Sequence, residues 1–157
     1  MPAPYRKIAC FIEEGHASEL ALQEAVALRA LTPGELHVVH VATRPYPLFV
    51  GMYGSIPPVE QYTDAAADWL RDRVADVPGA TPRLLRGWPP RAACQYVARE
   101  GIDLLVAAAH RGLVERAMLG GFAAYVAYHA PCSVLLVHPP VPTDAPGEEA
   151  VELAATP

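Results

Sequence analysis

A stretch near the end of the chain has the residue types of a phosphate-binding loop. AAHRGLVERAMLGG (108–121) lies between two apolar runs and contains Arg111, Arg116 and the pair Gly120–Gly121. Glycine lets the main chain approach phosphate oxygens closely, and successive amides can form a nest for an anion. Arginine adds charge and paired hydrogen-bond donors. The chemistry would be phosphate binding, but the glycines are few and come late in the stretch.

Other residues that could do chemistry form no catalytic set. We find no G-x-S-x-G elbow, no Walker A motif, no G-x-G-x-x-G and no carboxylate pair supported by its spacing. Glu13–Glu14 meets the first requirement of a receiver domain, but Gly87 and His138–Pro139 stand where that domain needs Asp and Lys. We therefore expect no catalytic residues.

The remaining histidines and cysteines favour structural roles. His37 and His40 are expected to be strand histidines that hydrogen-bond locally, and His16 or Ser18 to lie near the start of the first helix. The three cysteines, Cys10, Cys94 and Cys132, lack metal or redox spacing and are expected to be reduced, buried thiols. We expect no metal site, and we expect Trp69 and Trp88 to be packing residues.

Composition excludes two classes of partner. The formal net charge is -5 and Lys7 is the single lysine, so a basic nucleic-acid surface is not expected. No apolar run approaches the roughly 20 residues that span a bilayer. The apolar stretch near the N-terminus is short and is followed directly by Glu13 and Glu14, unlike a signal peptide. We expect a cytoplasmic protein without nucleic-acid or membrane binding.

The elements that must position these residues alternate between strands and helices. Five short apolar runs predict buried strands, and helical periodicity predicts helices between them. The third helix should end at Gly101, and the fourth should start only at about Gly121. The expected strands are 7–12, 35–41, 82–87, 103–109 and 133–138. This alternation predicts an α/β fold: a three-layer α/β/α sandwich with a five-stranded, parallel, doubly wound sheet in the order 3-2-1-4-5.

The domain is expected to cover residues 1–140. Residues 141–157 are rich in Pro and acidic residues, so we expect a disordered tail. The segment 43–58 is long for a connection between a strand and a helix, and we expect a lid, an interface arm or a mobile loop there.

Several pieces of the chain, in order, resemble the universal stress protein family. Residues 7–30 are similar to its first strand, turn and helix, although Glu13 stands where the family usually has Asp. ELHVVHV resembles its second strand, with His40 at the usual histidine. GWPPRAACQYVAREGIDLLVAAAH (87–110) and MLGGFAAYVAYHAPCSVLLVHPP (118–140) resemble the following segments. The resemblance implies a homodimer in which the last strands pair antiparallel, here through Cys132–His138.

The resemblance also implies an adenine-nucleotide site at the carboxyl ends of the strands. The acid that ends the first strand faces the ribose or a metal on the phosphates, and the main chain at the end of the second strand meets the adenine. The implied contacts in this chain are Ile12, Glu13, Val41, Ala108, His110, Arg111, Gly120 and Gly121.

The phosphate half of this implied site is damaged. The nucleotide-binding branch of the family carries G-x-x-G-x9-G-[ST]. With the third glycine of this motif aligned to Gly120, the first two glycines fall on Ala107 and His110, and the final Ser or Thr falls on Gly121. Aligning His110 with the histidine that commonly precedes the second glycine leaves the loop one residue short. Two lost contacts, each worth about 1.5–3 kcal/mol, would weaken binding by roughly two to four decades.

Three hypotheses follow for function. The leading one is a non-catalytic, homodimeric stress-response protein that binds unknown protein partners or an adenine-type ligand weakly. The second is an adenine-nucleotide sensor for ATP, AMP or cyclic AMP that uses the Gly120–Gly121 amides with Arg111 or Arg116. The third, slow ATP hydrolysis, lacks a visible base or metal set. No cofactor is certain, and ATP or AMP stays open.

Overall fold

A computed structural model describes residues 5–31, 33–43, 58–109 and 113–140; for Val59 and residues 113–120 it describes the main chain only. The segment 43–58, apart from its two ends, and the tail 141–157 therefore lie outside the described residues, as do His110 and Arg111. The predictions made for them stay predictions.

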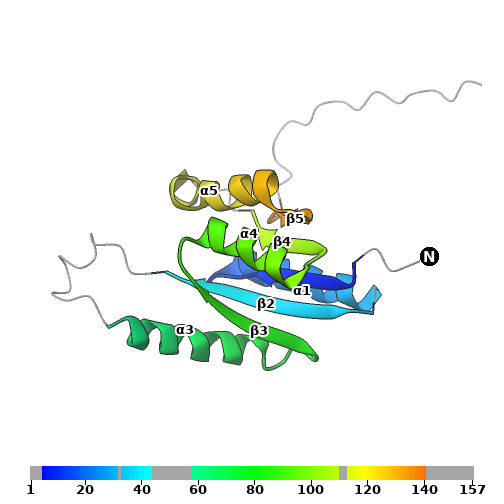
Figure 1. The fold of residues 1–157 in the computed structure, drawn as a ribbon, viewed down its shortest axis with the longest axis horizontal. Coiled ribbons are helices and arrows are strands. Elements are labelled where there is room, and N and C mark those ends of the chain that lie inside the picture. The colour runs from blue at the N-terminus through cyan, green and yellow to red at the C-terminus, as the bar shows by residue number, and fades with distance from the viewer. Residues whose placement is uncertain (1–4, 32, 44–57, 110–112, 141–157) are drawn as a thin grey trace, which may run out of the picture.

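The described chain alternates strands and helices as predicted (Figure 1). All neighbouring strands pair in parallel, in the order β3-β2-β1-β4-β5. The elements are β1 (Lys7–Phe11), α1 (His16–Leu31), β2 (Glu35–Ala42), α3 (Val59–Val74), β3 (Ala80–Arg86), α4 (Pro89–Glu100), β4 (Leu104–Ala108), α5 (Leu113–His129) and β5 (Ser133–Val137). The predicted sheet order is confirmed, and each predicted strand end lies within two residues of the observed one.

One face of the sheet is covered by α1 and α3. Alternate strand residues, among them Ile8, Cys10 and Val38, pack there against Leu22 of α1 and Leu70 of α3. Ala21 and Ala25 of α1 are fully buried against this face. Burial also raises the pKa of the Cys10 thiol to about 12, so Cys10 is an inert core residue.

The opposite face is covered by α4 and α5 (Figure 1). The intervening strand residues, including Phe11 and Val39, pack against Tyr96 and Val97 of α4 and Val126 of α5. Because successive side chains of a strand point to opposite faces, these two clusters follow from the period of two in β1, β2 and β4. Gly101 ends α4 with φ +63°, the left-handed conformation that favours glycine, as predicted.

The start of α5 differs from the prediction. The helix was expected from about Gly121, but it begins at Leu113. The sequence LVERAML (113–119) consists mostly of good helix formers. The two glycines each cost the helix about 1 kcal/mol relative to alanine, and α5 nevertheless continues through them.

Trp88 is also not the packing residue that was predicted. Its side chain is 58% exposed, and its ring lies edge-on to Tyr125 of α5 with the centroids 5.0 Å apart. Trp69 of α3 is half-buried, in line with the prediction. The position of Trp88 just before α4, outside any periodic apolar stripe, explains the difference.

The two strand histidines are held by local hydrogen bonds. His37 is buried; its Nδ1 lies 2.7 Å from the Tyr96 hydroxyl and its Nε2 lies 3.3 Å from a Glu35 carboxylate oxygen. Burial lowers the pKa of His37, so the neutral ring is favoured. His40 contacts the main chain, as described below. Within the described residues, no three His, Cys, Asp or Glu side chains are placed to hold a metal ion, and no helix is long and apolar enough to cross a membrane.

Candidate functional site

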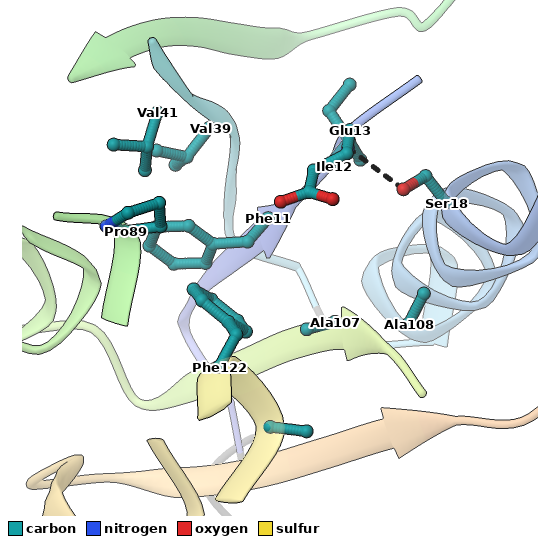
Figure 2. Close-up of a pocket in the computed structure, with 11 residues that line it drawn as sticks. Phe11, Ile12, Glu13, Ser18, Val39, Val41, Pro89, Ala107, Ala108 and Phe122 are labelled. Carbon is teal, nitrogen blue, oxygen red and sulfur yellow. Dashed lines mark hydrogen bonds between the residues drawn. The ribbon is translucent and has the colours of Figure 1, made fainter. Parts of the chain in front are cut away.

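A pocket opens at the carboxyl ends of β1, β2 and β4, where a doubly wound sheet places its ligands (Figure 2). The sheet supplies one wall, and α1, α4 and α5 supply the others. The described residues that line it are Phe11, Ile12, Glu13, Ser18, Val39, Val41, Pro89, Ala107, Ala108, Phe122 and Ala123.

Glu13 provides the charge of this otherwise apolar pocket. It is half-buried, and Figure 2 shows its carboxylate directed toward the centre of the lining residues. Among the described lining residues it is the single ionisable side chain. One carboxylate can accept hydrogen bonds from hydroxyl groups or attract a cation, whereas acid–base catalysis with a matched partner needs a second titratable group.

Ser18 links the first turn of α1 to the end of β1. Its buried hydroxyl accepts a hydrogen bond from the Glu13 N–H over 2.9 Å. The helix begins at His16, and the carbonyl of Gly15 accepts from the Glu19 N–H. Ser18 thus lies near the helix start, as predicted, but its hydroxyl bonds to the preceding strand end and does not cap the helix.

Two aromatic rings restrict the space in the pocket. The Phe11 and Phe122 ring centroids are 6.0 Å apart. The pocket volume is about 30 Å³, enough for about two water molecules at ~10–15 Å³ each. A nucleoside exceeds this volume, so it would extend past these residues or displace a wall side chain such as Phe122.

The structure brings together four of the eight residues predicted for the site. Ile12, Glu13, Val41 and Ala108 all line the pocket. All four lie at the carboxyl edge of the sheet, where the family resemblance implied a ligand site. Their contact with a ligand remains a prediction.

The predicted phosphate side is placed differently. Gly120 and Gly121 lie well inside α5, where main-chain N–H groups bond to carbonyls four residues earlier. The amides that lack a partner within this helix are instead those of its first turn, beginning at Leu113. Ala107, at the position of the first motif glycine, is buried and its side chain packs in the core beneath α4 and α5.

Several lining residues were not singled out from the sequence. Phe11 and Val39 are recognisable only as apolar strand residues, and Phe122 as an apolar helix residue. Pro89 carries a usable signal, because proline at the start of a helix that follows β3 marks the carboxyl edge. Phe122 has no comparable signal, since its place depends on how α5 packs.

Comparison with protein families assigns residues 4–138 to one model, described as the universal stress protein family. A search of curated proteins finds no significant match.

Solved structures share the fold at low sequence identity. The universal stress protein UspA from Lactobacillus plantarum is 22% identical with a TM-score of 0.66, over 85% of this chain and 97% of its own. A universal stress protein family member from Arabidopsis thaliana with AMP bound is 19% identical with a TM-score of 0.58, over 88% and 97%. The universal stress protein from Archaeoglobus fulgidus in complex with dAMP is 16% identical with a TM-score of 0.61, over 85% and 98%.

Proposed function

We propose that this chain, which belongs to the universal stress protein family, is a non-catalytic, homodimeric stress-response protein whose pocket accepts the adenosine part of a ligand and holds a triphosphate poorly. The observation that carries this proposal is the Glu13 carboxylate, directed into an apolar pocket at the carboxyl edge of the sheet (Figure 2). Family members from other organisms have been solved with AMP and dAMP.

The walls of the pocket suit a nucleoside. Val41 offers main-chain polar groups at the end of β2, Ile12 offers an apolar side chain, and Phe11 and Phe122 offer aromatic faces for a base. The Glu13 carboxylate can accept hydrogen bonds from both ribose hydroxyls. These features support binding of an adenosine-type ligand.

Support for poor triphosphate binding comes from the end of β4. Ala107 lines the pocket, and its methyl group takes up space that a glycine would leave to a phosphate oxygen. The amides of Gly120 and Gly121 lie inside α5, and Gly121 stands where the phosphate-binding motif has a Ser or Thr with its hydroxyl. A monophosphate or cyclic nucleotide needs fewer of these contacts than ATP does.

The homodimer is proposed through Cys132–His138, which contains β5. This strand is at the edge of the sheet, and its four apolar residues, Val134 to Val137, are only partly buried. The Val137 carbonyl accepts from the N–H of Ala109, the residue that follows β4. In a strand, the N–H and C=O of one residue face the same side, and successive residues alternate sides. Since Val137 faces β4, the N–H and C=O groups of Val134 and Leu136 face outward and are available to a second strand.

The competing proposal is an adenine-nucleotide sensor in which Arg111 or Arg116 replaces the lost phosphate contacts. The nucleotide complexes of the relatives favour it. The amides of the first turn of α5 would then be better donors than those of Gly120 and Gly121, because they are not bonded within the helix.

Calorimetric titration with AMP, cyclic AMP and ATP, each with Mg²⁺, separates the two proposals. We expect weak AMP binding and ATP binding no tighter than AMP binding. Low-micromolar ATP affinity would refute the leading proposal. Loss of that affinity in Arg111→Ala or Arg116→Ala would establish the sensor.

A further inference from the structure

The peptide group between Ile12 and Glu13 is held on both of its polar sides by side chains. The Ile12 carbonyl lies 2.9 Å from Nδ1 of His40 on β2, and the Glu13 N–H donates to Ser18 Oγ of α1 over 2.9 Å. The Ile12 N–H donates to the Val39 carbonyl, also over 2.9 Å. The Ile12–Glu13 peptide, which follows β1, is therefore held by hydrogen bonds to both β2 and α1.

The hydrogen bond to the Ile12 carbonyl shows which ring nitrogen of His40 carries a hydrogen. A carbonyl oxygen can only accept, so His40 Nδ1 carries the hydrogen and donates it. The half-buried ring is further fixed by Trp69 of α3, which lies edge-on to it with the centroids 4.9 Å apart. The His40 ring is therefore held by Trp69 of α3 on one side and by the Ile12 carbonyl, just after β1, on the other.

The contacts of His40 and the side chain of Glu13 lie on opposite faces of the sheet. His40 contacts Trp69 on the face covered by α1 and α3. The Glu13 carboxylate is directed into the pocket, beside Phe11 and Val39, which belong to the face covered by α4 and α5 (Figure 2). Rotation of the Ile12–Glu13 peptide would break the bonds to both His40 and Ser18 and would turn the carboxylate away.

We propose that His40 is a positioning residue of the pocket: its Nδ1–H fixes the Ile12–Glu13 peptide and so aims the Glu13 carboxylate at the ligand. His40 does not line the pocket itself. The inference rests on the proposed function for its ligand, but the direction of the Glu13 side chain can be tested without one.

Two substitutions separate the hydrogen bond from the packing. His40→Phe keeps a ring against Trp69 but removes the donor, whereas His40→Asn keeps a donor at the same distance along the side chain. With AMP as the probe, we expect His40→Phe to weaken binding about tenfold and His40→Asn to remain within roughly threefold of the unmodified protein. Equal affinity in His40→Phe and the unmodified protein would overturn the proposal, even if thermal stability fell.

A double-substitution cycle tests whether His40 acts through Glu13. In a Glu13→Ala background, His40→Phe should add less than about a twofold further loss, because the group that it positions has already been removed. A full additional tenfold loss would mean that His40 acts by another route and would contradict the proposal.

A crystal structure of the His40→Phe protein gives a readout that is independent of binding. We expect the Ile12–Glu13 peptide to be rotated and the Glu13 carboxylate to leave the pocket. An unchanged carboxylate would refute the positioning role whatever the affinities. If the unmodified protein does not bind AMP but the carboxylate moves in the variant, the proposed ligand is wrong and the positioning role stands.

Discussion

Replacing Glu13 by Gln is the most informative single change in the pocket. The substitution preserves the size of the side chain and removes its charge. The main-chain bond from Glu13 to Ser18 does not involve the carboxylate, so the local fold should persist. A change in affinity would therefore report on contact between the carboxylate and the ligand.

The expected loss follows from the type of hydrogen bond. A bond to a charged group contributes about 1.5–3 kcal/mol, and a neutral bond about 0.5–1.5 kcal/mol. Glutamine can still accept a bond from a ribose hydroxyl through its amide oxygen. The difference of about 1–1.5 kcal/mol corresponds to a loss of roughly five- to tenfold in AMP affinity.

Calorimetric titration of both proteins with AMP measures this loss. Glu14→Gln is the matched control, because Glu14 is the exposed neighbour and does not line the pocket. Its affinity should equal that of the unmodified protein. Equal AMP affinity in Glu13→Gln would show that the carboxylate does not contact the ligand, and the proposed binding mode would fail.

Three further predictions concern the dimer and the stability of the fold. Val134→Pro removes an outward-facing N–H of the edge strand β5 without removing a bond to β4, so light scattering should detect monomers while circular dichroism shows an intact fold; a persistent dimer would exclude pairing through β5. Burial lowers the pKa of His37 in the folded protein, so as the pH falls the unfolded chain takes up a proton at a higher pH than the folded protein does. The free energy of unfolding should therefore fall as the pH drops below about 6.5. Urea unfolding between pH 7.5 and about pH 5 should show a shallower dependence in His37→Gln, and an unchanged slope would contradict this account. Gly101→Ala forces a side chain into the left-handed region, which costs about 1 kcal/mol and should lower Tm by roughly 2–4 °C; an unchanged Tm in a thermal melt would count against that cost.

The central strands β1, β2 and β4 could be predicted because they are buried on both faces. Residues 8–11 and LLVAA are continuous apolar runs, and the alternation with helices leaves few parallel topologies. The carboxyl ends of such strands meet at one edge of the sheet. Ile12, Glu13, Val41 and Ala108, which the family resemblance implied as contacts, lie together at this edge.

The start of α5 could not be predicted from its glycines. A glycine pair in a chain can mark a helix start, a turn or a helix interior, and the surrounding residues decide between them. Here Leu113 to Leu119 favour helix, so the pair falls inside α5. The interpretation of Gly120 and Gly121 as free phosphate donors depended on this boundary.

The details of the pocket depend on contacts between elements that are distant in sequence. His40 and Ser18 bond to the same peptide from β2 and α1, and Phe122 reaches Phe11 from α5. Sequence periodicity gives the face on which a residue lies but not its hydrogen-bond partner. Such contacts require the packed structure.

The central claim is that adenosine, and not a triphosphate, is what this pocket recognises. A crystal structure of protein purified directly from cells and then soaked with AMP tests it at the ends of β1, β2 and β4. We expect the ribose hydroxyls of AMP to donate hydrogen bonds to the Glu13 carboxylate and the Phe122 side chain to be displaced. ATP retained through purification, with its γ-phosphate bound by main-chain nitrogens between residues 108 and 121, would contradict it.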